Sequence, residues 1–379
     1  MRKIRVIDLK AGMKFDKAVY IEGENILVPA EISIRQKDID RLTRWEIEEV
    51  QTEGSEINEQ AEDLSEQFKQ TTAWLPIREE KYLKFYRTVV EKVDRIFLDI
   101  VEGTTVSHDP IDSVVSDLIE ILRQGKNEMI QLILIEEWVE RRLSAGAINC
   151  TVIASIIGHS LKLVGHRLLH LTTGALLHDV GMLRISKKIL KKEGKLTPDE
   201  LNQVKTHPIL GYRIISKELK FPEEIASIAL QHHEHWDGKG YPRSLKGEDI
   251  SLSARVVAVA DSYEAMVSER PYRSPIIGYS AMKNILSDNG KYFDPKVLKA
   301  FLESMGVFPI GSIVQLNNSS IGRVVDNHID APLRPKIEIF IDEYGAKITE
   351  MEIVDLLMWK NLFIVKAIDP KVIGVSRNE

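Results

Sequence analysis

A set of histidines and aspartates in the middle of the chain constrains its fold more than any other feature. The pair His178-Asp179 follows two leucines, and His207 begins a His-Pro-Ile-Leu-Gly segment. Two adjacent histidines open the segment 232–242, His-His-Glu-His-Trp-Asp-Gly-Lys-Gly-Tyr-Pro, and Asp261 follows an apolar run. A fold in which these groups act together must bring separate parts of the chain to one place.

The local context of these residues favours a shared site. Adjacent histidines on a regular helix point about 100° apart, so His232 and His233 converge only where several ions cluster or where the helix ends. Asp237-Gly238 predicts a helix end directly after them. Asp261 follows Arg255–Ala260, a buried helix by composition, where a carboxylate is costly unless it is paired or binds a metal. The alternative is six unrelated polar residues, which the length and order of the pattern disfavour.

The residue types indicate the chemistry of such a site. Imidazoles and carboxylates without a nearby cysteine are a ligand set for iron, manganese or zinc. Two ions that share a carboxylate can activate water and bind a phosphate between them, as phosphoester hydrolysis requires.

Composition excludes several other classes of protein. A chain of 379 residues predicts two or three domains, and a net charge of −6 excludes a general basic surface for DNA or RNA. The single cysteine, Cys150, allows no internal disulfide and favours a reducing compartment. The first twenty residues lack the apolar core of a signal peptide, and apolar runs such as Met129–Ile135 are shorter than the ~20 residues of a membrane helix. We therefore expect a cytoplasmic protein without a membrane partner.

Hydrophobic patterning predicts a multidomain chain in which helix dominates. We expect a small α/β unit over 1–54, regulatory in role, and a linker over 55–77 that is rich in Glu and Gln. A helical domain then covers 78–305, and a β-rich extension covers 306–379. In the first unit, Ala18–Ile21 and Ile26–Val28 predict a hairpin, and Ser33–Trp45 has near-helical apolar spacing.

The helical part begins with apolar stripes between 78 and 145. Such helices form either a bundle or dimerisation element or the first layer of the following domain, and we favour the second. Thr197-Pro-Asp-Glu200 predicts a capped helix start, and Asp294-Pro295 predicts the start of the last helix. After Gly306 we expect three strands, Ser312–Leu316, Ile321–Val325 and Lys336–Ile341, and a mixed tail beyond about residue 348.

Five motifs together resemble the HD-GYP family, a branch of the HD metal-dependent phosphohydrolases. They cover roughly 146–303 and comprise Leu-Leu-His178-Asp179-x-Gly181, Ile189-Leu190-x-Lys-x-Gly194-x-Leu196-Thr197, His207-Pro208-x-x-Gly211, His232-His233-Glu234-x-x-Asp237-Gly238-x-Gly240-Tyr241-Pro242, and Arg255-x-x-x-Val-Ala260-Asp261 continued to Arg270-Pro271-Tyr272-Arg273. The resemblance implies an all-helical domain with two or three iron or manganese ions. It also implies hydrolysis of cyclic di-GMP to pGpG or GMP.

The resemblance also implies roles for individual residues. Asp179 bridges two ions and is the catalytic residue. The expected metal ligands are His178, Asp179, His207, His232, His233 and Asp261. The expected substrate-binding residues are Arg270, Arg273, Tyr241 and Lys239, with plain packing as the equal alternative for Tyr241.

Three departures from the family pattern bear on activity. The family's histidine on the helix before the His-Asp pair is Gly146 here, and the glutamate four residues earlier in trinuclear members is Arg142. The lysine usual after His-Asp-x-Gly is Met182. We therefore expect two divalent ions, preferably iron, with manganese as the alternative. Each lost ligand or charge costs a few kcal/mol, or roughly 100-fold in rate.

Two functional hypotheses follow from this pattern. The first is a cyclic di-GMP phosphodiesterase with a binuclear centre and reduced activity. The second is a catalytically degenerate cyclic di-GMP receptor or protein-interaction module. An HD hydrolase that acts on another nucleotide is a further possibility beside these two. A homodimer and a signalling protein such as a diguanylate cyclase are the protein partners considered.

Overall fold

The chain forms two compact units, Met1–Lys69 and Gln70–Glu379. The computed structural model describes residues 2–9, 13, 15–21, 26–28, 34, 38–39, 42–43, 45, 47, 49–55, 80–104, 107–135, 142–192, 194–268, 277–288 and 290–368. The predicted linker, apart from residue 55, lies outside these residues. The expected boundaries of the domains stay predictions.

The first unit contains a four-stranded antiparallel sheet of order β1-β4-β2-β3. Its strands are β1 (Arg2–Arg5), β2 (Val19–Tyr20), β3 (Ile26–Val28) and β4 (Glu49–Thr52), with a 3-10 turn, η1 (Val6–Asp8), after β1. The predicted hairpin is confirmed, because Val19 pairs with Val28. Of the predicted helix 33–45, residues 38–39 and 42–43 are helical, and Ile34 and Leu42 are buried in the core of this unit.

The second unit begins with three helices, of which the first two each carry one apolar stripe. These are α3 (Glu80–Glu102), α4 (Asp109–Gln124) and α5 (Lys126–Ile135). In α3, residues such as Tyr82, Val89 and Ile96 recur at helical spacing and are buried. They belong to the same core as the helices that follow, so the prediction of a first layer is confirmed.

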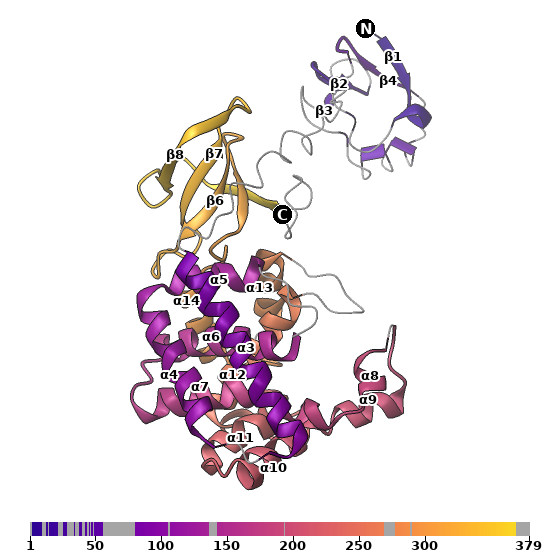
Figure 1. Ribbon diagram of the computed structural model, residues 1–379. Coiled ribbons are helices and arrows are strands. Elements are labelled where there is room, and N and C mark those ends of the chain that lie inside the picture. The colour runs from indigo at the N-terminus through magenta and orange to yellow at the C-terminus, as the bar shows by residue number, and fades with distance from the viewer. Residues whose placement is uncertain are drawn as a thin grey trace. The chain divides into compact units, whose positions relative to one another are not determined.

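The central helix of the second unit is α6 (Arg142–Ser160). It packs against α3, α7, α12 and α14, and Figure 1 shows these helices around it. Its segment Leu143–Ser160 is long and apolar enough to cross a membrane, with a mean hydropathy of 1.3, but 78% of it is buried inside the protein. Helix α6 is therefore the core helix of this unit.

The remaining helices of the second unit include those whose ends carry the site. They are α7 (His166–Leu177), η3 (Val180–Arg184), α8 (Lys187–Leu190), α9 (Pro198–Val204), α10 (His207–Arg213), the π-helical turn η4 (Ile214–Glu218), α11 (Glu223–Gln231), η5 (Gly247–Asp249), α12 (Leu252–Val267), α13 (Gly278–Ser287) and α14 (Pro295–Met305). The predicted cap of α9 is confirmed: Thr197 Oγ1 accepts the Glu200 N–H, and Glu200 Oε2 accepts the Thr197 N–H. Helices α8 and α9 project from the rest of the unit (Figure 1).

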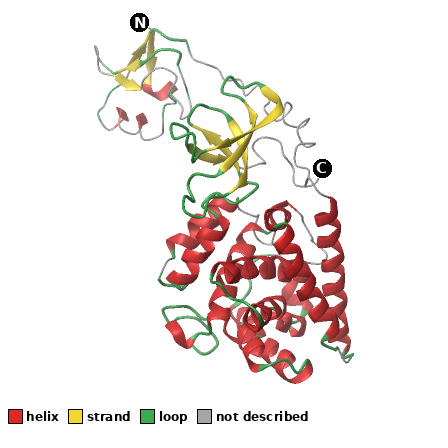
Figure 2. Ribbon diagram, turned by 90° about the vertical axis from the view of Figure 1, so that its left-hand side faces the viewer, coloured by secondary structure: helices red, strands yellow, loops and turns green. Residues whose placement is uncertain are grey.

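A five-stranded antiparallel sheet of order β8-β7-β6-β5-β9 follows the helices. Figure 2 shows it beside the helical part, and its inner residues join the helical core. The strands are β5 (Ile313–Leu316), β6 (Ile321–Asp326), β7 (Lys336–Ile341), β8 (Lys347–Asp355) and β9 (Ile364–Ile368).

The three strands expected after Gly306 are confirmed, but the expected mixed tail is wrong. Strand β8 pairs with β7, and β9 returns to pair with β5, so that Ile313 lies opposite Ile368. Two glutamates interrupt the apolar pattern of β8, and the position of β9 depends on a strand about fifty residues earlier in the chain. Local sequence therefore gave no sufficient signal for either strand.

Candidate metal centre

The six predicted ligands lie at helix ends and on one helix face. His178 and Asp179 follow the last residue of α7, and His207 is the first residue of α10. Helix α11 ends at Gln231, directly before His232 and His233. Asp261 lies within α12 after the buried residues 256–260. The helix end predicted after the two histidines thus occurs before them, which frees both imidazoles from the helical spacing.

Three of the histidines are oriented in the same way by the backbone. The Nδ1 atoms of His178, His207 and His232 lie 2.7, 2.7 and 2.8 Å from the carbonyl oxygens of the residues three positions earlier. A carbonyl only accepts, so each Nδ1 carries the proton and donates it. This arrangement fixes the tautomer and leaves each Nε2 lone pair free to bind a metal ion.

The Nε2 atoms converge on the carboxylate of Asp179. Its Oδ1 lies 3.2 Å from His207 Nε2 and 3.7 Å from His232 Nε2. Its Oδ2 lies 3.8 Å from His178 Nε2, which in turn lies 3.7 Å from Asp261 Oδ1. Two groups of ligand atoms result, one from Asp179, His207, His232 and His233 and the other from His178, Asp179 and Asp261. Asp179 belongs to both groups.

The donor set fits divalent cations. His207 Nε2 and His232 Nε2 lie 3.3 Å apart, although the Nδ1 of each ring already carries the proton that a neutral imidazole holds. Two lone pairs that face each other at this distance repel unless a cation or an additional proton lies between them. Both rings are buried, as is His178, so the protein holds three imidazoles and two carboxylates in a place where metal ions would satisfy them.

The electrostatics of the group agree with this assignment. Burial would raise the pKa of Asp179, but the surrounding histidines hold this pKa well below its ordinary value. Burial and then His232 lower the pKa of His233 well below the usual range, so this ring is neutral. Burial would lower the pKa of His178, but Cys150, Asp179 and then Asp261 hold it well above the usual range. The carboxylates are thus ionised and attract positive charge, which a metal ion supplies when it displaces the proton.

The loop after His233 covers one side of the cluster. Tyr241 donates its N–H to the His233 carbonyl, and its ring stacks on the His233 imidazole at 4.8 Å between centroids. Burial, together with the charges of Asp179 and Asp261, raises the pKa of the Tyr241 hydroxyl. A Cβ atom at Gly240 would collide with the backbone of residues 233–235, so only glycine allows this close approach.

Glu234 holds this loop through two hydrogen bonds to its backbone. Its side chain is 3% exposed, and its two oxygens accept the N–H groups of Arg243 at 2.7 Å and Leu245 at 3.0 Å. Both bonds have an ionised acceptor, which makes them stronger than neutral ones. Glu234 directly follows the two adjacent histidines, so its hydrogen bonds connect residues 243–245 to this end of the loop.

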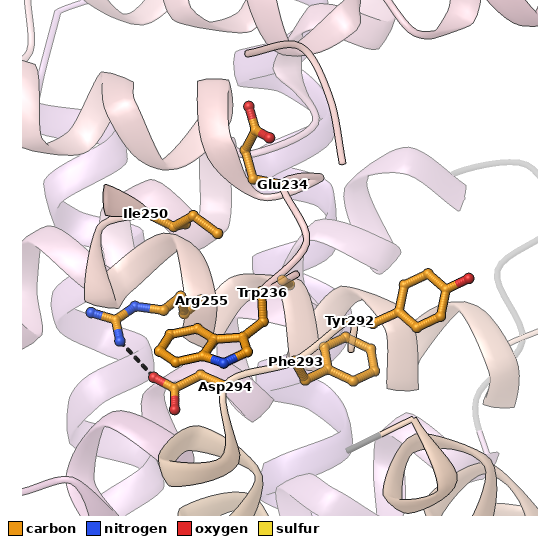
Figure 3. Close-up of a pocket in the computed structure, with 8 residues that line it drawn as sticks. Glu234, Trp236, Ile250, Arg255, Tyr292, Phe293 and Asp294 are labelled. Atoms are coloured by element: carbon orange, nitrogen blue, oxygen red, sulfur yellow. Dashed lines mark hydrogen bonds and ion pairs between the residues drawn. The ribbon is translucent and has the colours of Figure 1, made fainter. Parts of the chain in front are cut away.

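A small pocket lies beside this loop, and Figure 3 shows its lining. Arg255 donates to Asp294 at 2.6 Å, and its guanidinium lies 5.5 Å from the Trp236 ring centroid. Trp236 also donates its backbone N–H to the Tyr292 carbonyl. These contacts join the loop to α12 and to the start of α14, which holds the second histidine segment against the helix that carries Asp261.

The other predicted site residues have different surroundings. Arg270 and Arg273 lie outside the described residues. Lys239 has an 83% exposed side chain and an ion pair with Asp237 at 3.4 Å. Gly146 lies on α6 opposite α12, and a Cβ atom there would be 3.4 Å from Glu264 Oε1. A carboxylate thus occupies the space beside the position where the family has a histidine.

Sequence reasoning gave no role to two residues that the structure brings to this site. Glu234 was part of a motif, and its position next to two ligands was the signal that could have identified it. Lys205 lies two residues before His207, and its Nζ is 5.3 Å from the Tyr241 ring centroid. A cation that close in sequence to a ligand was the corresponding signal.

Comparison with known proteins agrees with the motifs. The model of a family described as HD domain matches residues 116–297, and one described as KOW domain associated with HD domain matches residues 313–375. Residues 116–297 form an HD domain of the HD-GYP type. The HD domain thus contains all six predicted ligands, and the C-terminal sheet is the KOW-like part of the chain.

Several curated relatives share this HD domain. A cyclic di-GMP phosphodiesterase of Pseudomonas aeruginosa is 29% identical over 261 residues, which are 69% of this chain and 63% of the relative. One of Thermotoga maritima is 48% identical over 128 residues, 34% of this chain and 35% of the relative. The cyclic di-GMP phosphodiesterase response regulator RpfG of Xanthomonas campestris is 36% identical over 184 residues, 48% of this chain and 49% of the relative. The aligned part spans less than two thirds of each relative.

Proposed function

We propose that this protein is a cytoplasmic phosphodiesterase that hydrolyses cyclic di-GMP to pGpG or GMP at a binuclear metal centre. The observation that carries the proposal is that Asp179 belongs to both groups of ligand atoms. A carboxylate with one oxygen toward each group can hold two ions at the spacing that phosphoester hydrolysis uses. The names of the curated relatives support cyclic di-GMP as the substrate.

The protein's own residues hold and orient the reactants. His207, His232 and His233 with Asp179 would hold one ion, and His178 and Asp261 with Asp179 would hold the other. When bound, a pair of divalent ions activates water and neutralises the phosphate oxygens. Imidazoles mixed with carboxylates suit iron, with manganese as the alternative.

The substrate contacts come from outside the ligand set. Tyr241, stacked on His233, forms a flat wall for a base or sugar. Arg270 and Arg273 bind phosphate oxygens as forked donors, and Lys239 binds from the exposed loop.

The test combines metal analysis with turnover. Protein purified without oxygen should contain two ions per chain, and cyclic di-GMP should give pGpG or GMP on chromatography. Asp179→Asn, which keeps the side-chain shape but removes the charge, should lose at least one ion and turnover. Asp117→Asn changes an exposed carboxylate of α4 that pairs with Lys92, and it should leave both unchanged. Wild-type protein with two ions and no product would refute the enzyme.

A receptor without turnover is the second candidate. Gly146 favours this candidate, because the family's histidine ligand is missing at this position. The group of His178, Asp179 and Asp261 offers three ligands. Binding of cyclic di-GMP without product would support the receptor, and a homodimer or a signalling protein would then carry the response.

A further inference from the structure

Lys205 is a cation at the edge of the metal centre. It is the residue after α9, it is exposed, and it lies two positions before His207. Its Nζ is 5.3 Å from the centroid of the Tyr241 ring. Among the residues that the structure describes, no carboxylate lies within ion-pair distance of this ammonium.

Tyr241 connects this cation with the ligand cluster. The Tyr241 ring stacks on His233, and the charges of Asp179 and Asp261 act on its hydroxyl. Lys205 therefore lies on the Tyr241 side of the ligand cluster.

The neighbouring position that carries a cation in the family does not do so here. Met182 lies in η3, directly after the His-Asp segment, and its side chain is half-buried and neutral. Arg255 is already engaged by Asp294 and by the ring of Trp236. Lys205 is thus a described cation that lies beside the Tyr241 ring and has no ion-pair partner among the described carboxylates.

We propose that Lys205 binds a phosphate of the substrate on the Tyr241 side of the centre and supplies the positive charge that position 182 lacks. This inference rests on the proposed function for the identity of the substrate. An ammonium on a flexible stem has three donors and can leave the face of an aromatic ring for a phosphate oxygen, where it forms a stronger, charge-assisted bond.

The experiment compares cyclic di-GMP binding and turnover by the full, metal-loaded chain. Lys205→Ala should raise Kd and KM by roughly 10- to 100-fold, as the loss of one charge-assisted bond predicts. Because the contact is made in both the ground state and the transition state, kcat should change much less. Lys205→Arg should retain most of the affinity. Lys188→Ala, at an exposed lysine of α8, is the matched control and should behave as wild type.

Two further measurements separate a phosphate contact from a structural role. Metal content should be the same in Lys205→Ala and wild type; loss of an ion would mean that Lys205 acts through His207 and would overturn the proposal. Met182→Lys in the Lys205→Ala background should restore affinity. Unchanged Kd and KM in Lys205→Ala would also overturn it.

Failure of the proposed function can be distinguished from failure of this inference. If wild-type protein neither binds nor cleaves cyclic di-GMP, the proposed function fails. Binding of inorganic phosphate by the metal-loaded proteins then decides the role of Lys205. Weaker phosphate binding by Lys205→Ala than by wild type and Lys188→Ala would support it, and equal binding would refute it.

Discussion

Replacing Glu234 by alanine should loosen the loop that follows the two adjacent histidines. The substitution removes the acceptor of two backbone N–H groups, those of Arg243 and Leu245. Each bond to a charged acceptor contributes about 1.5–3 kcal/mol, so the sum is at most about 3–6 kcal/mol. Arg243 is exposed and Leu245 is half-buried, so water can replace part of the loss. We therefore expect a local cost of about 2–3 kcal/mol.

Hydrogen exchange followed by mass spectrometry measures this cost where it arises. A cost of that size should speed exchange of the segment 232–251 by roughly 30- to 150-fold. Glu234→Gln keeps one acceptor and should show about half of the free-energy change. Metal content should fall in Glu234→Ala, because His233 loses the support of Tyr241. Glu223→Ala removes an exposed carboxylate at the start of α11, the helix that precedes the loop, and serves as the control.

A rise of less than threefold in exchange of this segment in Glu234→Ala would contradict the role of Glu234 in holding the loop. An equal rise in Glu223→Ala would contradict it as well, since the effect would then belong to α11 and not to the loop. Faster exchange with normal metal content would mean that the histidines are held by their own backbone contacts alone.

Three other substitutions test separate parts of the structure. Gly146→His should tighten binding of the weaker ion by roughly 10-fold or more in a chelator competition, once Glu264 moves aside, and unchanged affinity would contradict a missing ligand at this position. Gly240→Ala should cost about 1–3 kcal/mol and lower metal content, because its Cβ would enter the backbone of the preceding turn; wild-type content and melting temperature would count against it. Burial would raise the pKa of Asp326, but Lys336 lowers it, so the pair stabilises the fold above the unfolded pKa of about 3.9 and this contribution is lost as pH falls through the lower folded pKa. Asp326→Asn should therefore cost about 0.5 kcal/mol at pH 7 and flatten the acid limb of stability against pH, whereas a parallel curve would refute the assignment.

Two of the three departures from the family have different structural surroundings. At Gly146, the space beside the missing imidazole faces the carboxylate of Glu264 on α12, which accepts a hydrogen bond from Ser268. At Met182, the neighbouring cation of η3, Arg184, is engaged in an ion pair with Glu218 at 2.9 Å. Under our proposal, Lys205 in the turn before α10 supplies the missing charge.

The sequence by itself predicted which histidines and aspartates the fold brings together and where several helices begin. The cap at Thr197 and the start of α14 at Asp294 depend on contacts within a few residues, so their signals are local. The order of histidines and aspartates likewise indicated a candidate ligand set, because imidazoles and carboxylates together suit transition-metal ions.

Only the tertiary structure decided how these residues face one another. The shared position of Asp179 between two groups, the approach of Lys205 to Tyr241 and the pairing of β9 with β5 all join segments that are far apart in the chain. Such contacts depend on the packing of whole helices and strands around one core, and no local periodicity encodes the distance between two elements.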